Sequence, residues 1–254
     1  MNFEIGHSVC DLWTMPECLA VAAKSASRFI NKNKVNAFYH PPRSKEIERY
    51  LEPLLNLHKV PLISKPFSTV LTRWYSYCGE KMHVSEINCP NVMLLDCDIM
   101  FVHDPTPLWD EDFDVAVMDA SIWKKENVLH QPCWLKEWRD LFDKYDRKSV
   151  PYFSTGFTLF KDNILKEIID DWIFYMNEDL PLLYTAFFSK EEMALALAVS
   201  NCKIIRYYDD IIREAYKREQ ANLPFYSNIR DWEKEPEPMA WHIGYRGPLF
   251  VKEF

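Results

Sequence analysis

Short apolar runs alternate with amphipathic segments along this chain. Continuous or alternating apolar residues, typical of strands, occupy 3–9, 35–40 and 91–96. Apolar residues recur every three or four positions in 16–30, and the same helical spacing returns at 133–145. Because strands that alternate with helices form mostly parallel sheets covered on both faces, the pattern predicts an α/β fold with a mostly parallel central sheet flanked by helices.

The same criteria locate the other elements. Further strands are expected at 59–63, 114–119, 151–163, 202–208 and in the tail after 235. Further helices are expected at 44–57, with an interruption near Pro53, and at 66–79, 164–176 and 190–199. Thr14 and Glu17 have the spacing of a capping box at the start of the helix expected at 16–30. Gly79 is expected to end the helix at 66–79. A chain of 254 residues is the size of one large domain, so we expect a single domain over 1–254.

Composition and charge exclude several classes of function. The 38 acidic and 30 basic side chains give a net charge of -8, which argues against nucleic acid as a partner. No apolar stretch reaches the roughly 18 to 20 residues that a membrane helix needs, and the N-terminus lacks the pattern of a secretion signal, so we expect a cytoplasmic protein without a transmembrane segment. The seven cysteines include no C-x-x-C pair, and the five glycines form no phosphate-binding loop.

Two aspartates follow the apolar run at 91–95. Asp96 and Asp98 are expected at the C-terminal end of that strand, where open α/β sheets bind their ligands. On extended backbone, residues two apart point to the same side, so both carboxylates could face one Mg²⁺ or Mn²⁺ ion. The alternative is a pair of solvated carboxylates at a turn. The apolar residues on both sides favour the metal, because burying two charges without a cation is costly.

The segment "VMLLDCDIMFVHDPTPLW" resembles the D-x-D segment of type A glycosyltransferases, including glycogenin-like retaining enzymes. Three later segments resemble other parts of this family in the same order: "PYFSTGFTLFKDN", "SKEEMALALAV" and "WHIGYRGP". The resemblance covers roughly residues 1–250. It implies a nucleotide-binding half at 1–105, which ends in the D-x-D segment, and an acceptor and sugar half at 106–254.

The resemblance implies a metal site made of Asp96, Asp98 and His242 on the diphosphate of the donor. An imidazole ligand would favour Mn²⁺ over Mg²⁺, which prefers oxygen. Without the resemblance, a single histidine beside a tryptophan is more often a packed or surface residue.

The start of the helix at 190–199 carries Glu191 and Glu192. In retaining members of the family an acidic or amide residue at this place lies close to the anomeric carbon, and Glu192 is the better match to it. Ser189 and Glu192 also fit the capping box S-x-x-E, so a purely structural role explains them equally well.

The remaining candidates are positions at which the family binds the nucleotide and the sugar. They are Ser8, Cys10, Asp11, Arg73, Asp96, Ser154, Thr155, Gly156 and Arg246. For Arg73 a solvated helix face is an equal alternative. The family commonly has Asn before Ser-Gly, whereas this chain has Ser154 there, and Arg246 substitutes for a lysine of the closing segment. Gly156 lies inside an expected strand, which often marks the close approach of a backbone or ligand.

The sequence thus predicts a metal-dependent transferase that moves a sugar from a nucleotide diphosphate donor, UDP by family frequency, to a glycan, protein or lipid acceptor. Retention of configuration is favoured over inversion, because Glu192 lies at the matched position. Two alternatives stay open. One is a non-catalytic nucleotide-sugar-binding module of the same fold, and the other is a D-x-D phosphohydrolase, which would normally need a small residue where Met100 stands. A sugar nucleotidyltransferase lacks support, because no glycine-rich basic loop follows the first strand.

Overall fold

The computed structural model describes residues 2–9, 15–39, 49, 51–60, 78–119, 131–178, 189–207, 211–214 and 239–242. Cys10, Asp11, Arg73 and Arg246 lie outside these residues, as do Thr14 and almost all of the helix expected at 66–79. Ser8 and His242 are described by their backbone only.

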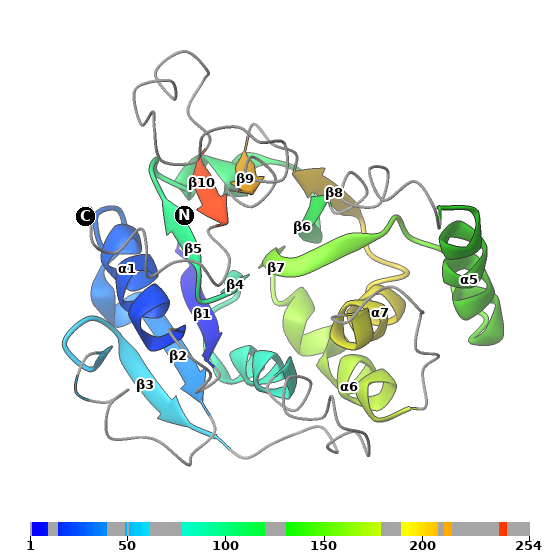
Figure 1. Ribbon diagram of the computed structural model, residues 1–254, viewed down its shortest axis with the longest axis horizontal. Coiled ribbons are helices and arrows are strands. Elements are labelled where there is room, and N and C mark those ends of the chain that lie inside the picture. The colour runs from blue at the N-terminus through cyan, green and yellow to red at the C-terminus, as the bar shows by residue number, and fades with distance from the viewer. Residues whose placement is uncertain are drawn as a thin grey trace.

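A seven-stranded sheet forms the centre of the molecule (Figure 1). Its order is β3 (Asn56–Lys59), β2 (Val35–Tyr39), β1 (Glu4–Val9), β4 (Val92–Leu95), β7 (Phe153–Phe160), β6 (Val115–Asp119) and β8 (Ile204–Tyr207). The strands of 1–105 pair in parallel, and β6 pairs in parallel with β8. Only β7 runs antiparallel to its two neighbours. The α/β fold with a mostly parallel central sheet is therefore confirmed.

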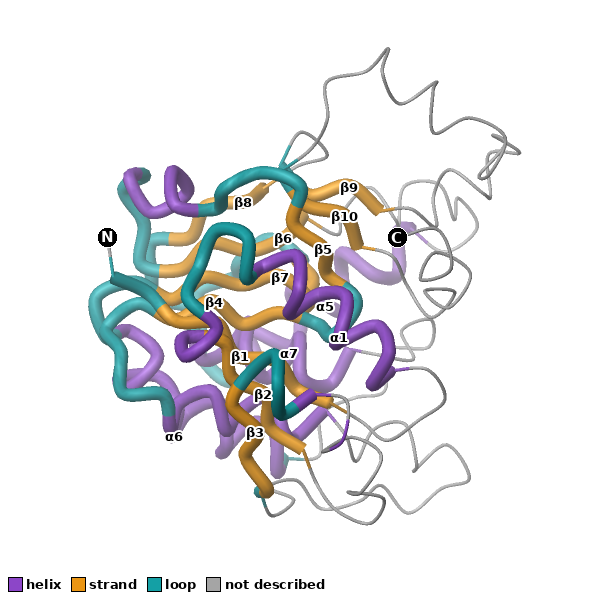
Figure 2. Tube along the Cα trace, turned by 90° about the vertical axis from the view of Figure 1, so that its left-hand side faces the viewer, coloured by secondary structure: helices purple, strands orange, loops and turns teal. Residues whose placement is uncertain are grey.

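The apolar pattern explains why β4 is central and β3 lies at an edge. All four residues of β4 are buried, as expected for a strand covered on both faces, whereas β3 is only partly buried. In Figure 2 the strands follow one another from β8 near the top to β3 near the bottom. Strands from residues 1–105 occupy one side of the sheet and strands from 106–254 the other, and the two sets meet where β4 pairs with β7.

Helices cover both faces of the sheet. On one face lie the 3-10 helix η2 (Cys78–Glu86), α6 (Ile164–Asn177) and α7 (Ser189–Ala198), which share an apolar core with α5 (Gln131–Lys144) (Figure 1). On the other face, α1 (Met15–Ala26) and the short η3 (Thr106–Asp110) contribute to a second core. A third 3-10 helix, η1 (Lys32–Lys34), precedes β2. Among the described residues, no helix is long and apolar enough to cross a bilayer.

A second sheet extends from the D-x-D segment. It has three strands in the order β5 (Ile99–Phe101), β10 (Ala240–His242) and β9 (Ile212–Glu214). β10 pairs antiparallel with β5 and parallel with β9. The strand in the tail was expected from the sequence, whereas β5 and β9 were not.

Two predicted boundaries can be compared with the structure. The helix expected at 44–57 ends at Leu51, in agreement with the predicted interruption near Pro53, which disfavours helical backbone before it. The next strand begins at Asn56 rather than at residue 59, because it is aligned by pairing with β2 and by the Asn56 side-chain amide, which donates to the Asn36 side-chain oxygen at 3.3 Å. Gly79 lies inside η2, and the helix that it was expected to end lies almost entirely outside the described residues.

Candidate functional site

The D-x-D segment forms a turn between the two sheets. The Asp96 N–H donates to the Gly156 carbonyl at 2.8 Å, and the Ile99 N–H donates back to the Asp96 carbonyl at 3.3 Å. The backbone at 97–98 is therefore turned rather than extended, so Asp96 and Asp98 do not lie two residues apart on one strand as predicted. The chain turns here because β4 belongs to the central sheet and β5 to the second sheet.

The two aspartates differ in exposure. Asp98 is 6% exposed, and the side chain of Asp96 is 28% exposed. Cys97 between them is buried in the apolar core. A carboxylate as deeply buried as Asp98 is stable only beside donors or a cation.

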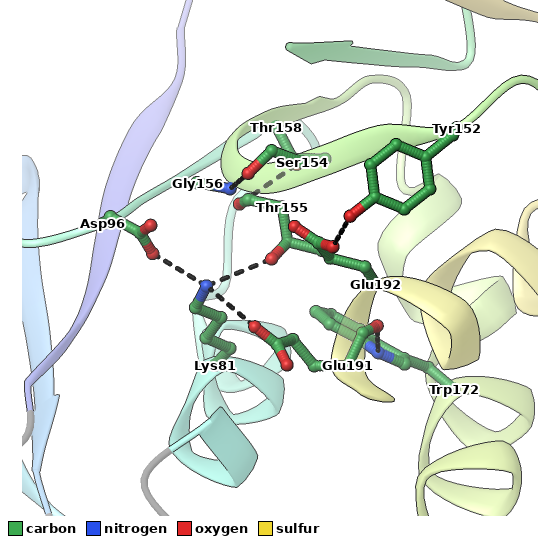
Figure 3. A network of polar contacts seen from close by, with 10 residues as sticks. All are labelled: Lys81, Asp96, Tyr152, Ser154, Thr155, Gly156, Thr158, Trp172, Glu191 and Glu192. Atoms are coloured by element: carbon green, nitrogen blue, oxygen red, sulfur yellow. Dashed lines mark hydrogen bonds and ion pairs between the residues drawn. The ribbon is translucent and has the colours of Figure 1, made fainter. Parts of the chain in front are cut away.

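Lys81 brings four elements together beside Asp96 (Figure 3). Its ammonium lies 2.7 Å from Asp96 Oδ1 and 3.6 Å from Glu191 Oε1, and it donates to Thr155 Oγ1 at 3.1 Å. The lysine projects from η2, which packs under β1 and β2, and only 6% of it is exposed. A buried ammonium is costly unless it is paired and hydrogen-bonded, and these three oxygens meet that need.

Gly156 provides the space for the Asp96 carboxylate. A Cβ at this position would lie 2.6 Å from Asp96 Oδ2, closer than carbon and oxygen can approach. The Gly156 N–H also donates to Ser154 Oγ at 3.2 Å. The glycine inside the expected strand thus marks a close approach, as predicted, and the group that approaches is Asp96.

Glu191 and Glu192 turn in different directions from the first turn of α7 (Figure 3). Both are buried. Glu191 reaches Lys81, and its carbonyl accepts a hydrogen bond from Trp172 Nε1 at 3.3 Å. Glu192 accepts a hydrogen bond from the Tyr152 hydroxyl. Burial, and then the negative charge of Glu192, raise the pKa of Tyr152 well above its usual value, so this hydroxyl keeps its proton. Glu191, rather than Glu192, is the carboxylate joined to Asp96 through a shared partner.

His7 contacts the D-x-D turn through the Asp96 carbonyl. Its ring is fully buried in β1, and Nδ1 lies 3.3 Å from the Asp96 carbonyl, to which it donates. Burial lowers the pKa of His7 to about 4, although hydrogen bonds to the backbone and the charges of Asp96 and Asp98 act in the opposite direction. The imidazole is therefore neutral at pH 7. Nε2 is buried and has no hydrogen-bond partner among the described residues.

The backbone of His242 lies next to the D-x-D turn. In the antiparallel pair of β10 with β5, His242 is opposite Ile99, the residue that follows Asp98. This register brings the third expected metal ligand to the same place as the two aspartates, although its side chain lies outside the described residues. Within the described part of the chain, no three His, Cys, Asp or Glu side chains group around a cation position.

The residues that are present fit a divalent ion in their chemistry. Asp98 offers a buried carboxylate, the Asp96 carboxylate is 28% exposed, and the register adds an imidazole-bearing strand. Two carboxylates and one imidazole form a donor set that suits Mn²⁺.

The other sequence-predicted residues lie around this site or outside the described chain. Thr155 is buried against Lys81, Ser154 is half-buried beside Gly156, and the Ser8 backbone pairs with Phe38 of β2. Lys81, His7 and Tyr152 were not predicted as site residues. Met82, His83 and Val84, which follow Lys81, are all buried, but this burial results from the packing of η2 and gives no signal in the sequence.

Comparisons with known proteins reveal similarity in structure but not in sequence. No protein-family model matches the chain, and a search of curated proteins finds no relative. The structure of mouse xyloside xylosyltransferase 1 in its apo form matches 96% of this chain and 99% of that one, with a TM-score of 0.52 and 10% identity.

Two further solved structures match over nearly the whole chain. Galactosyltransferase LgtC in complex with donor and acceptor sugar analogs matches 95% of this chain and 87% of that one, with a TM-score of 0.52 and 14% identity. A glycosyltransferase involved in the glycosylation of the major capsid of PBCV-1 matches 99% of this chain and 98% of that one, with a TM-score of 0.54 and 9% identity. At these identities the similarity is one of fold, and it agrees with the resemblance that the D-x-D segment suggested. The chain therefore has the α/β fold of the type A glycosyltransferases.

Proposed function

We propose that this protein transfers a sugar from a nucleoside diphosphate donor, UDP in the first place, to a glycan, protein or lipid acceptor. The observation that carries the proposal is the convergence of Asp96, Lys81, Thr155 and Glu191 at the end of β4, in a fold shared with solved glycosyltransferases. Open α/β sheets bind ligands at this end of their strands.

The site would hold a divalent cation through Asp98, Asp96 and His242, with Mn²⁺ favoured over Mg²⁺. When bound, such an ion neutralises the charge that develops on the departing diphosphate. Asp98 would supply a carboxylate that needs little rearrangement, because only 6% of the residue is exposed and its neighbours already hold it in place. His7 would hold the Asp96 carbonyl in place, and with it the turn that carries both aspartates.

In the transfer itself, the bond between the anomeric carbon and the diphosphate breaks, and its electron pair leaves with the diphosphate. The acceptor hydroxyl oxygen forms a new bond to the anomeric carbon, and its proton passes to the departing diphosphate. Glu191, 3.6 Å from Lys81, is the carboxylate that we place near the cationic sugar, and it would stabilise the positive charge of the transition state. This arrangement favours retention of configuration. Glu192 would instead position α7 through Tyr152.

Several finer parts of the proposal rest on the sequence. Cys10, Asp11, Arg73 and Arg246 stay candidates for the nucleotide, and Ser8, Ser154 and Gly156 for the nucleotide and sugar. The division into a donor half at 1–105 and an acceptor half at 106–254 stays a prediction, as does a cytoplasmic location.

Ligand-dependent thermal stability tests the proposal. We expect UDP with Mn²⁺ to raise the melting temperature of the wild-type chain and of Asp110→Asn, an exposed aspartate in η3. Asp98→Asn should lose that increase. A panel of nucleotide sugars should then identify a donor that the wild type hydrolyses and Asp98→Asn does not.

The result also separates the alternatives. Binding of UDP without hydrolysis or transfer of any sugar in the panel would indicate the non-catalytic binding module. Absence of both binding and hydrolysis would overturn the proposal.

A further inference from the structure

Lys81 and a divalent cation need the same carboxylate. The ammonium lies 2.7 Å from Asp96 Oδ1, a distance typical of a strong charge-assisted hydrogen bond. A metal ion on the Asp96 carboxylate would place a second, larger positive charge a few ångströms from this ammonium. The two cations would repel each other, and the repulsion is strong because Lys81 is almost completely removed from solvent.

Neither the Asp96 carboxylate nor the Lys81 ammonium can easily move away from the other. The Asp96 N–H is fixed by the Gly156 carbonyl at 2.8 Å, and Oδ2 lies against the Gly156 Cα, where not even a Cβ would fit. Lys81 is in turn held by Thr155 at 3.1 Å and by Glu191 at 3.6 Å. The carboxylate and the ammonium are thus fixed against each other by three segments of chain, η2, β4 and β7, and by the first turn of α7.

An anion would relieve the repulsion. An ammonium that gives up Asp96 needs another negatively charged oxygen, since a buried lysine without one is costly. The described residues already supply Glu191, and a diphosphate would supply more. Binding of the cation alone should therefore be opposed by Lys81, whereas binding of the cation with a diphosphate should not.

Building on the proposed function, we propose that Lys81 competes with the divalent cation for Asp96 and thereby makes cation binding depend on the diphosphate. Lys81 acts here as a positioning residue whose ammonium balances the charge of Asp96, whatever contacts it makes with a donor. The site would then select the cation together with its nucleotide rather than the free ion.

Direct measurement of Mn²⁺ binding tests this competition without any assay of activity. We would titrate Mn²⁺ alone into the wild type, Lys81→Gln, Lys81→Arg and the control Lys203→Gln, by calorimetry or by electron paramagnetic resonance of the free ion. Lys203 is exposed and pairs with Asp112. Lys81→Gln should bind Mn²⁺ alone about five- to fiftyfold more tightly than the wild type, a range typical of coupling between sites. Lys81→Arg, which keeps the charge, and Lys203→Gln should show no such gain.

The same titrations in the presence of UDP complete the test. The factor by which UDP increases Mn²⁺ affinity should be smaller in Lys81→Gln than in the wild type. The proposal is overturned if folded Lys81→Gln binds Mn²⁺ alone no more tightly than the wild type. It is also overturned if Lys81→Arg binds Mn²⁺ alone more tightly than the wild type, a result that decides the question even if Lys81→Gln does not fold. A gain in Lys81→Gln together with no turnover of any nucleotide sugar would support the competition and overturn the proposed function.

Discussion

The Tyr152 hydroxyl donates a hydrogen bond to the Glu192 carboxylate, and this contact joins the residue before β7 to the first turn of α7. Tyr152 also packs edge-on against Trp138, with ring centroids 5.0 Å apart, so the contact reaches as far as α5. Glu191 is consequently left on the side of α7 that meets Lys81.

Removal of this hydroxyl should cost stability more than function. Tyr152→Phe takes a donor from a buried carboxylate, and we expect the free energy of unfolding to fall by about 1–3 kcal/mol. Urea denaturation measures the change. Tyr145→Phe, a half-buried tyrosine whose oxygen accepts from exposed Lys144, should change stability by less than about 0.5 kcal/mol. Equal losses in the two variants would contradict a stabilising role for the Tyr152 contact.

The two glutamates of α7 should differ in catalysis. With a donor identified by the nucleotide-sugar panel, Glu191→Gln should lower kcat by about 100-fold or more, as for the loss of an electrostatic contact to a transition state. Glu192→Gln should have a much smaller effect on kcat, because the amide oxygen can still accept from Tyr152. Steady-state kinetics of both variants at equal folded fraction measures this. A larger loss in Glu192→Gln would assign the catalytic role to Glu192, as the sequence resemblance implied.

The close approach at Gly156 can be tested against a second glycine. A Cβ would lie 2.6 Å from Asp96 Oδ2 at Gly156 and 2.7 Å from Val84 Cγ1 at Gly6. We therefore expect Gly156→Ala and Gly6→Ala each to lose about 1–3 kcal/mol of stability, as for an overpacked core. Only Gly156→Ala should also weaken the binding of Mn²⁺ with UDP, because it displaces Asp96. Unchanged binding in folded Gly156→Ala would contradict the placement of the metal at Asp96.

His7 should make the fold sensitive to acid. Its pKa is about 4 in the folded chain and 6.5 in the reference state, so between these values the unfolded chain binds a proton that the folded chain excludes. The stabilising contribution is complete above pH 6.5 and is lost as the pH falls toward 4. The full difference corresponds to about 3 kcal/mol.

Urea denaturation between pH 7.5 and 4.5 checks this expectation. The wild type and a control at the exposed His103, His103→Gln, should lose more stability on acidification than His7→Gln. Parallel losses in all three proteins would show that carboxylates alone cause the sensitivity to acid.

The hydrophobic pattern predicted the fold well because the central strands are buried on both faces. The sequence has an apolar run at β4 and an aromatic, β-branched segment at β7, and the structure has a strand at both places. The start of β3 at Asn56 could not be predicted, because the edge strand is aligned by side-chain amides and by pairing with β2 rather than by apolar residues. The second sheet was missed for a related reason, since β5 and β9 pair through β10 from a distant part of the chain.

The candidate site was only partly visible in the sequence. Asp96 and Asp98 were found because apolar residues surround them, and Gly156 because it interrupts a strand. Lys81 was not found, since a lysine in a polar segment is usually solvated and only the packing of η2 against the sheet shows where it points. The different directions of Glu191 and Glu192 depend on the partners Lys81 and Tyr152, which no spacing in the sequence reveals.

The pairing of β10 with β5 gives the site an order of assembly. The central sheet draws its strands from residues up to Tyr207, whereas His242 reaches the D-x-D turn only through β10. Contacts between residues so far apart in sequence form late, because closing a long loop is entropically costly. The chain up to β7, whose Gly156 carbonyl accepts the Asp96 N–H, can thus build the turn that carries Asp96 and Asp98 before the histidine strand docks beside it. During synthesis, the three proposed metal ligands Asp96, Asp98 and His242 would come together only after β10 has left the ribosome.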